Sequence, residues 1–499
     1  METRTNPLNS NWFYGLIVIF YLIVAYNSSG FNHWDEHYQI IEFANYKLGR
    51  ANPGDLAWEF SEQIRPGLQP LLCYLVLKAI SLLGCRDPFF STFILRGISA
   101  VASIIAIRRF LWSCRGQVSE KNLLPFFLLS FFLWFIPYLS VRFSSECWSG
   151  IFFTLALSFI QSPEVSSNKK ILMIGMCLGL SILFRYQSVI LAAGICAWFL
   201  FIVRLPVKKL YLLSASILAV IISGLFIDRW FYGEYCFTMF NYFKVNLLDG
   251  VAASFGTSPW YYIVLYIIRG PGLILGLLLF NAIILFCYFR PKHVLVWSAV
   301  PFLIIHAVIA HKELRFLYPL ANVIPFVMVM AWQDISSRIV FGHGLIKCSL
   351  GVILVAVNIV GLVAINLKGA GLGRIALAEK IYRRYPRSEI NLMYSSYGDP
   401  YTDWIPPRNT FYRNRNVTRR ELKTVSRQEI LANTEKSKIN LLAVPDQAGK
   451  NFPVAKMLHE LKFVSWFQSI PDILTEVNNL YDPSINGSGI TVYLLEEDN

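Results

Sequence analysis

The chain has 499 residues, of which 55% are hydrophobic and only 15% charged. Soluble domains carry about a quarter charged residues, so the composition excludes an ordinary soluble protein and indicates a polytopic membrane protein. The formal net charge of +14 would suit nucleic acid in a soluble protein. Here much of it lies in short loops between apolar segments, where basic residues set topology, so we expect membrane lipid and no nucleic acid as a partner.

Eleven apolar segments are candidates to cross a bilayer, which takes about 20 residues. The expected spans are 12–28, 89–110, 121–140, 146–161, 170–184, 187–204, 209–227, 259–289, 293–310, 314–333 and 345–366. The segment 259–289 is long and contains the break Gly270-Pro-Gly272. No clear cleavage site follows the first span, so we interpret it as a retained anchor; cleavage near Ser28-Ser29 is the alternative.

The segment 67–84 could also span, but the loop charges argue against it. With a cytosolic N-terminus and 67–84 at the opposite surface, every expected cytosolic loop is basic, as the positive-inside rule requires. We therefore expect 30–88 to be a long non-cytosolic loop with two helices at the membrane interface. In the first helix one face is mainly apolar (His37, Ile40, Ile41, Ala44, Leu48) and another polar (Gln39, Glu42, Asn45).

The composition turns polar after residue 366, which predicts a transmembrane catalytic domain over 1–366 and a soluble domain over 367–499. Apolar runs in the second predict strands at 391–394, 439–444, 463–467 and 490–495, with a helix at 453–461. The fold class is therefore an all-α polytopic membrane protein with a small C-terminal α/β domain. Eleven spans make that domain non-cytosolic, as do the sequons at Asn416 and Asn486. The nine cysteines lack a CxxC motif, and we interpret them as thiols in apolar surroundings.

The same topology places five charged clusters on the non-cytosolic side. Ionisable side chains beside hydrocarbon are costly and commonly functional. We expect these clusters to converge as an active site. They are His33-Trp-Asp-Glu-His37, Arg142 with Glu146, Arg185, Asp228-Arg229, and His311-Lys-Glu-Leu-Arg315.

These side chains suit transfer of a sugar from a lipid phosphate to a hydroxyl of a second lipid-linked glycan. A carboxylate must take the acceptor's proton; we assign this to Asp35, because Glu36 points about 100° away on a helix. Cations must stabilise the departing phosphate. The candidates are Lys312 and Arg315 with His311, then Arg185 and Arg229. A single base and a phosphate leaving group imply inversion at the sugar carbon. No all-oxygen cage for a divalent ion is evident, so we expect neither a metal nor another cofactor.

Structural roles could explain the same residues, and the sequence leaves them open. Asp35 and Glu36 could favour a helix start, and the 311–315 cluster could be an interfacial collar. The remaining three clusters could also have local roles. Arg142 and Glu146 could pair on one helix, Arg185 could cap the end of a span, and Asp228 and Arg229 could form an ion pair.

Several of these stretches together resemble glycosyltransferase family 22, the GPI and N-glycan mannosyltransferases that use dolichyl-phosphate mannose. His33-Trp-Asp-Glu36 is similar to the family's H-x-D-E signature, and His311-Lys-Glu-Leu-Arg-Phe-Leu-Tyr-Pro319 to its H-K-E-x-R-F-x-x-P element. Asp228–Thr238 with Asn241-Tyr-Phe243 resembles its central loop, and Trp58-Glu59 with Ile64-Arg65 the segment after the first signature. The matches occur in order over most of residues 30–330.

The resemblance implies a membrane fold of the GT-C type, with Asp35 facing the acceptor and His311, Lys312, Glu313 and Arg315 lining the donor phosphate site. The group that adds the third GPI mannose is the most similar. Two stretches differ from that group: Phe184-Arg-Tyr-Gln187 stands for Phe-Arg-Pro-Thr, and Asn391–Gly398 lacks a Cys-His-Ser-Thr-Pro run.

The resulting hypothesis is an inverting mannosyltransferase at the non-cytosolic face, in the endoplasmic reticulum of a eukaryote or the inner membrane of a bacterium. Its partners would be a polyisoprenyl-phosphate sugar and a lipid-linked glycan such as a GPI precursor. Rival readings are a transferase for another lipid-phosphate sugar in bacterial glycan assembly, a lipid-glycan transporter, and a membrane scaffold. A transporter would place charges near mid-membrane on broken helices, whereas here they gather at one surface.

Overall fold

The computed structural model describes residues 11–338, 344–367, 369–395, 397–401, 407–472, 474 and 489–496. The chain divides into two compact units. The first contains the described residues of Met1–Ala25, with Glu59–Cys73 and Leu95–Val363. The second contains Tyr26–Trp58, Tyr74–Ile94 and the described residues of Ala364–Asn499. The second unit thus joins the polar C-terminal part to segments of the expected long loop.

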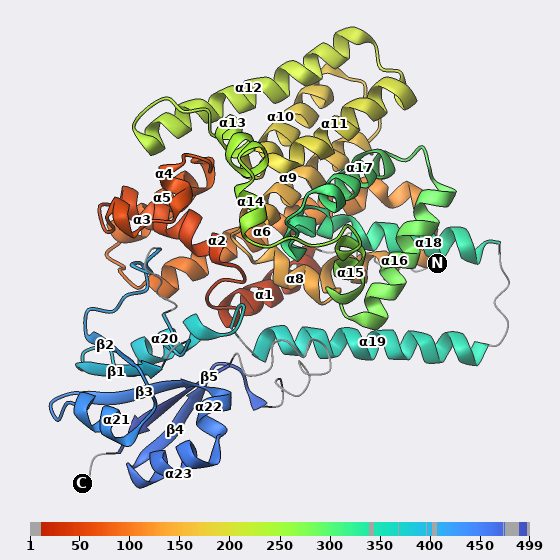
Figure 1. The fold of residues 1–499 in the computed structure, drawn as a ribbon. Coiled ribbons are helices and arrows are strands. Elements are labelled where there is room, and N and C mark those ends of the chain that lie inside the picture. Colours follow the sequence, from red (N-terminus) through yellow and green to blue (C-terminus); the bar gives the residue numbers. More distant parts are fainter. Residues whose placement is uncertain are drawn as a thin grey trace. The chain divides into compact units, whose positions relative to one another are not determined.

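Helices are present at each of the eleven expected spans (Figure 1). They are α1 (Asn11–Asn27), α6 (Pro88–Cys114), α7 (Glu120–Phe132), α8 (Phe135–Ser140), α9 (Ser145–Ile160), α10 (Asn168–Phe184), α11 (Val189–Trp198), α12 (Val207–Tyr232), α15 (Tyr262–Arg269), α16 (Leu273–Phe289), α17 (Val294–Val308), α18 (Ile324–Ser336) and α19 (Gly344–Leu367). Among the described residues, four helical stretches are long and apolar enough to cross a membrane: Pro88–Gln117, Tyr186–Val203, Val207–Tyr232 and Leu314–Ser336. The count of eleven spans therefore stays a prediction.

Shorter helices connect these elements. They are α2 (Trp34–Glu36), α3 (Glu42–Lys47), α4 (Trp58–Ser61), α5 (Leu68–Leu82), α13 (Thr238–Phe243) and α14 (Val251–Ser254). The segment 67–84, which was expected to lie at the interface, forms α5. A π-helical segment, His37–Ile41, joins α2 to α3, and a 3₁₀ segment, Leu314–Val323, leads into α18.

Two expected spans are broken, each for a local reason. The 259–289 span breaks as predicted, because Gly272 has φ +98°, a conformation that suits only glycine well. The 121–140 span is interrupted between α7 and α8, which the sequence did not predict. There the Trp134 N–H donates to Asn358 Oδ1 (2.8 Å) and Asn358 Nδ2 donates to the Phe132 carbonyl (2.7 Å). A side chain of α19 thus satisfies the backbone groups that the interruption frees.

Small residues set how closely the helices of the first unit approach. A Cβ on Gly175 would lie 1.7 Å from Ser216 Oγ, and one on Gly179 would lie 2.7 Å from Val220 Cβ. Glycines four residues apart on α10 therefore admit α12 at short range, as is common between membrane helices.

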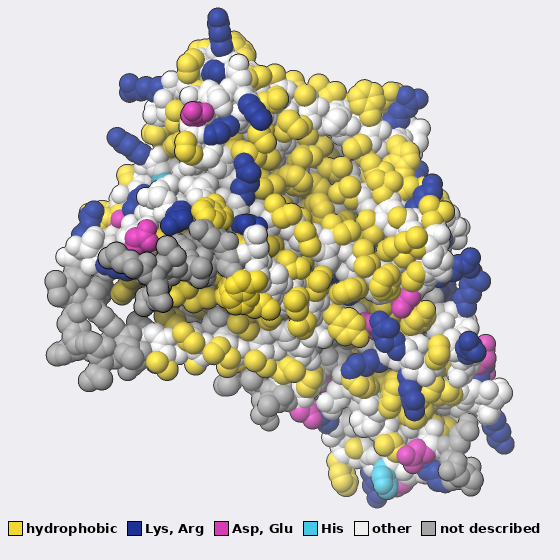
Figure 2. Space-filling model, turned by 180° about the vertical axis from the view of Figure 1, so that it is seen from behind, with side chains coloured by type: hydrophobic (Ala, Val, Ile, Leu, Met, Phe, Trp, Pro, Cys, Tyr) yellow, Lys and Arg dark blue, Asp and Glu magenta, His cyan; other side chains and the backbone are white. Residues whose placement is uncertain are grey.

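The outer surface of the helices is largely apolar. Figure 2 shows hydrophobic side chains spread over a broad face of the helical part. Exposed aliphatic and aromatic side chains occur on α6, α12 and α19, among them Ile105, Phe226 and Ile359. Such surface is favourable against lipid and unfavourable against water. These helices and this surface make the chain an integral membrane protein.

The second unit contains a five-stranded sheet in the order β2-β1-β3-β5-β4 (Figure 1). Its strands are β1 (Ile390–Ser395), β2 (Val417–Leu422), β3 (Ile439–Pro445), β4 (Phe463–Gln468) and β5 (Ile490–Leu495). The pairs β1–β2 and β1–β3 are parallel, and β3–β5 and β4–β5 are antiparallel. The four predicted strands are confirmed, and β2 was missed.

Helices cover both faces of the sheet. One apolar cluster joins α20 (Arg374–Arg384) to β1, β3 and β5. The other joins α21 (Arg427–Asn433) and α23 (Phe452–Glu460) to the opposite side chains of β1, β3 and β4. The predicted helix 453–461 is α23, and α22 (Asp446–Lys450) precedes it. The sequon at Asn416 lies at the start of β2, and Asn486 is outside the described residues.

Candidate active site

Three charged side chains that are distant in sequence meet inside the first unit. Ser144 caps α9 by accepting from the Cys147 N–H (3.3 Å), which leaves Glu146 in the first turn, where the helix dipole favours a carboxylate. Arg185 ends α10 in an extended conformation, and Arg315 lies near the start of the 3₁₀ segment. A Cβ on Gly150 would lie 3.0 Å from Pro319 Cα, so glycine lets this segment approach α9.

These side chains form an alternating network of charge. Glu146 Oε1 accepts from Nη1 of Arg185 and from Nη1 of Arg315, each at 3.0 Å. Arg315 also donates to Glu313 through Nη2 (3.1 Å) and through Nε. His311 Nε2 lies 2.8 Å from Glu313 Oε1. The side chains of Arg185, Glu146 and Arg315 are exposed by only 6%, 3% and 9%, so each charge depends on its neighbours for stabilisation.

The network is balanced in charge, because two guanidiniums face two carboxylates. Both guanidiniums also lie over the ring of Phe316, at 5.1 Å for Arg185 and 5.5 Å for Arg315. A phosphate could bind bidentately to either arginine, provided that a carboxylate gives up part of its contact. We name Glu146, Arg185, His311, Glu313 and Arg315 the arginine cluster.

Lys312 points its ammonium group at backbone carbonyls. Its Nζ donates to Ile309 O (2.5 Å), Ser258 O (2.7 Å) and, at 3.5 Å, Ala310 O. His311 Nδ1 lies 2.9 Å from Gly256 O, so both residues tie the 311–315 element to the loop before α15. Burial lowers the pKa of Lys312 from its usual value. A phosphate-binding role for Lys312 would require one of these carbonyls to be released.

Asp228 and Arg229 have separate partners. Asp228 is buried at the end of α12 and accepts from the Gly67 N–H (2.7 Å) and the Thr238 hydroxyl (2.6 Å). Arg229 is exposed and donates to Tyr235 OH (2.6 Å). Asp228 therefore holds the turn before α5 against the start of α13. The sequence left open a local ion pair between Asp228 and Arg229. In the described structure the two side chains bind these other partners instead.

Arg142 lies in the turn before α9 and is only 1% exposed. Its guanidinium lies 5.3 Å from the centre of the Tyr138 ring. The sequence suggested Arg142 as a partner of Glu146 on one helix. The structure gives Glu146 two arginines from other elements, and Arg142 lies in the turn that precedes its helix.

In the second unit, a short helical turn presents Asp35. His33 caps α2, and its Nδ1 accepts from the Asp35 N–H (3.3 Å) and lies 3.4 Å from Asp35 Oδ1. The Asp35 side chain is 15% exposed. Glu36 is turned inward and accepts from the Asn32 N–H (3.2 Å). Glu36 and His33 thus help to form the helix start, and the Asp35 side chain lies on the same short turn.

The polar face of the helical run after Asp35 is buried within the second unit. Glu42 and Asn45 are 0% and 2% exposed. Their partners lie in the loop 408–412: Glu42 Oε1 accepts from the Thr410 and Phe411 N–H groups (2.7 and 2.9 Å), and Asn45 donates to Thr410 Oγ1 (2.9 Å). Sequence reasoning missed this role because the partners follow Glu42 by 368 residues or more.

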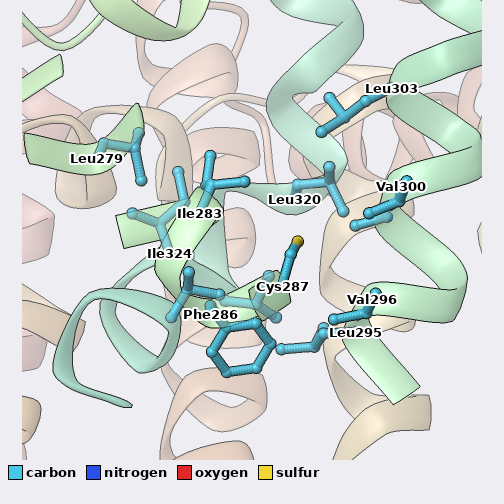
Figure 3. Close-up of a pocket in the computed structure, with 13 residues that line it drawn as sticks. Leu279, Ile283, Phe286, Cys287, Leu295, Val296, Val300, Leu303, Leu320 and Ile324 are labelled. Carbon is cyan, nitrogen blue, oxygen red and sulfur yellow. The ribbon is translucent and has the colours of Figure 1, made fainter. Parts of the chain in front are cut away.

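An apolar cavity of about 70 Å³ opens between α16, α17, the 3₁₀ segment and α18 (Figure 3). Its lining is hydrophobic, with one thiol, and includes Leu279, Phe286, Cys287, Leu295, Leu320 and Ile324. Leu320 and Arg315 share the 3₁₀ segment. The 3₁₀ segment therefore contributes Arg315 to the arginine cluster and Leu320 to the lining of the apolar cavity. Across the part of the chain that is described, no group of three His, Cys, Asp or Glu side chains could hold a metal ion.

Comparison with known proteins agrees with this architecture. The chain is 24% identical over 359 residues to GPI mannosyltransferase 3 of Candida albicans, covering 71% of each chain. It is 29% identical over 309 residues to human GPI alpha-1,2-mannosyltransferase 3, covering 60% of this chain and 53% of that protein. The chain thus spans little more than half the length of several curated relatives.

Among solved structures, ArnT from Cupriavidus metallidurans bound to undecaprenyl phosphate has a TM-score of 0.51 at 10% identity, covering 98% of both chains. That likeness indicates a shared fold of the GT-C type. Residues 12–381 match the Alg9-like mannosyltransferase family, a match that includes both the Asp35 turn and the arginine cluster. The chain is therefore a member of the Alg9-like mannosyltransferase family.

Proposed function

We propose that this protein transfers mannose from a polyisoprenyl phosphate, such as dolichyl phosphate, to a hydroxyl of a lipid-linked glycan such as a GPI precursor. The arginine cluster carries the proposal. Two nearly buried guanidiniums share one carboxylate, Glu146, so either can turn to a phosphate when the donor binds. Charge-assisted hydrogen bonds then stabilise the negative charge that develops as the glycosidic bond breaks.

Asp35 is the proposed general base. A carboxylate on a fixed turn can accept the proton of the attacking hydroxyl while its backbone stays in place. With one base and a phosphate leaving group, the hydroxyl displaces the phosphate directly, and the sugar carbon inverts. His33 and Glu36 would support Asp35, and Arg142, Asp228 and Arg229 would take part in substrate binding. Lys312 would hold the element that contains Arg315.

The apolar cavity beside the 3₁₀ segment would offer apolar contact to part of the donor lipid. Its lining offers hydrocarbon on the element that also contains Arg315, and apolar surface binds such a chain by the hydrophobic effect. A donor whose phosphate is at Arg315 would then extend its lipid along α16 and α17.

We also propose that the active site opens at the non-cytosolic face, with eleven spans and a non-cytosolic sheet domain. The basic loops that the sequence assigns to the cytosol support this orientation. The compartment would be the endoplasmic reticulum in a eukaryote or the inner membrane in a bacterium. Glycosylation of Asn416 in a microsomal translation system would support the orientation, and cleavage of the unglycosylated C-terminal segment by protease added outside the microsomes would contradict it.

A donor with two labels tests the proposed reaction. The purified chain in detergent receives polyprenyl-phosphate mannose labelled with ³H in the sugar and ³²P in the phosphate, together with a membrane lipid extract as acceptor. A transferase separates the labels and leaves ³H in a new glycolipid of inverted anomeric configuration. Donor that binds or crosses a vesicle bilayer with both labels still joined, under the same conditions, would identify a transporter instead.

A further inference from the structure

The Asp35 turn is held by the C-terminal part of the second unit. Upstream of Asp35, the Ala370 N–H donates to Ser29 O (2.9 Å), and a Cβ on Gly30 would lie 2.9 Å from Ile375 Cβ. Downstream, the loop 408–412 meets Glu42 and Asn45. Both ends of the turn are therefore fixed by residues that follow it by more than 300 positions in the sequence.

The downstream contact is centred on one buried carboxylate. Glu42 is 0% exposed and receives two consecutive backbone N–H groups, from Thr410 and Phe411, and the Thr410 hydroxyl. A buried charge is costly unless it is fully hydrogen-bonded. Because these donors come from the loop 408–412, the helical run after Asp35 keeps Glu42 buried only while the loop stays in place.

His37 connects Glu42 to the segment that contains Asp35. Its Nε2 lies 2.9 Å from Glu42 Oε1, and its ring stacks between Tyr412 (centroids 5.2 Å apart) and Phe31 (5.1 Å). The stack therefore joins the first and last residues of the segment 31–37, which contains Asp35. The π-helical segment His37–Ile41 links Asp35 to Glu42, and such segments are frequent at functional sites.

We propose that the loop 408–412 sets the orientation of Asp35, and that Glu42 and Thr410 are positioning residues for the transfer reaction. This inference rests on the proposed function, in which Asp35 is the base. Loss of the Thr410 hydroxyl would loosen Glu42, then His37, and then the turn. Transfer would slow because a base that is slightly misplaced loses much of its effect, whereas the donor site in the first unit would be unaffected.

The chain contains a matched control for this contact. Glu429 also accepts from two consecutive backbone N–H groups, those of Lys423 (2.7 Å) and Thr424 (2.8 Å), and from the Thr424 hydroxyl (2.8 Å). This second contact lies in an exposed part of the C-terminal segment and contains no residue of the proposed active site. Thr410→Val and Thr424→Val therefore remove the same kind of hydrogen bond from two places.

The test compares wild type, Thr410→Val, Thr410→Ser and Thr424→Val as full-length proteins. We expect Thr410→Val to lower kcat at least about tenfold, with donor Kd unchanged, and Thr410→Ser and Thr424→Val to stay within about twofold of wild type. Near-normal kcat in Thr410→Val would overturn the proposal. So would a loss of donor binding and thermal stability as large as the loss of kcat, because that pattern indicates a general folding defect.

Hydrogen–deuterium exchange provides a readout that does not depend on activity. Peptides covering 31–41 should exchange at least about threefold faster in Thr410→Val than in Thr424→Val, because local opening precedes exchange. Equal exchange in the two variants would show that the Thr410 contact does not hold the Asp35 turn, and it would overturn the proposal. If wild type transfers no mannose, the proposed function fails, and the exchange result still decides whether the loop holds the turn.

Discussion

The arginine cluster and the Asp35 turn bury charge in different ways. In the cluster, side chains neutralise one another: Glu146 pairs with both Arg185 and Arg315, and Glu313 also pairs with Arg315. In the turn, backbone groups and caps hold the acids, since Glu36 and Glu42 accept main-chain N–H groups. Paired side chains can exchange partners with a ligand, whereas backbone-held acids keep one geometry. The first arrangement suits a phosphate site, and the second suits a fixed frame for the base Asp35, which lies on the same turn.

Replacing Glu146 by Gln should have the largest effect on stability. Two nearly buried guanidiniums would lose their shared carboxylate, which costs about 3 kcal/mol in the free energy of unfolding. Thermal unfolding in detergent measures the change. Glu120→Gln is the control, because Glu120 is also an acid in the first turn of a helix but is exposed. Equal unfolding temperatures for the two variants would show that the cluster contributes little to stability.

Replacing Arg315 by Lys should weaken donor binding about tenfold or more, because lysine keeps the charge but loses the planar fork that serves both a carboxylate and a phosphate. The Kd for polyprenyl-phosphate mannose measures this effect. Arg290→Lys is the control, since Arg290 binds Asp334 through Nε (2.6 Å) and Nη2 (2.9 Å) away from the cluster. A tenfold weakening in both variants would contradict a specific role for Arg315.

The arginine cluster shows what the sequence could not supply. Glu146, Arg185, Glu313 and Arg315 were selected as candidates from their place at the ends of spans. The pairing of Glu146 with Arg185 and Arg315 was not predicted, because these arginines lie on other elements, 39 and 169 residues further along the chain. The family was predictable because the signatures around Asp35 and Arg315 occur in order, and the match of residues 12–381 to the Alg9-like mannosyltransferase family confirmed it.

The fold was predictable where one short pattern decides it. Apolar length located the helices of the spans, and the glycines at 270–272 located a break. The strand β2 was missed because Val417–Leu422 is polar and lies at the sheet edge, with Arg419 and Arg420 in its middle. The burial of Glu42 was missed because an amphipathic pattern does not reveal that a distant loop covers the polar face.

Alkaline pH should have the smallest of these effects. Burial lowers the pKa of Lys312, so its ammonium loses its proton at a lower pH than that of an ordinary lysine, near 10.4. As pH rises through this lowered value, the contacts to Ser258 and Ile309 weaken and donor Kd should rise. The free energy of unfolding should instead rise with pH between the lowered pKa and the ordinary one, because the unfolded state binds more protons in that range. Lys312→Arg should remove the alkaline rise in Kd; its persistence would assign the rise to another group.

The assay with the doubly labelled donor, applied to wild type and Asp35→Asn, tests the central claim most directly. The asparagine keeps the size of the side chain but cannot accept the proton of the hydroxyl, so transfer should fall about 10²–10⁴-fold. Donor binding should be unchanged, because the proposed phosphate ligands, Arg185 and Arg315, are not replaced. An Asp35→Asn protein that separates the two labels at a near-normal rate would contradict the assignment of Asp35 as the base.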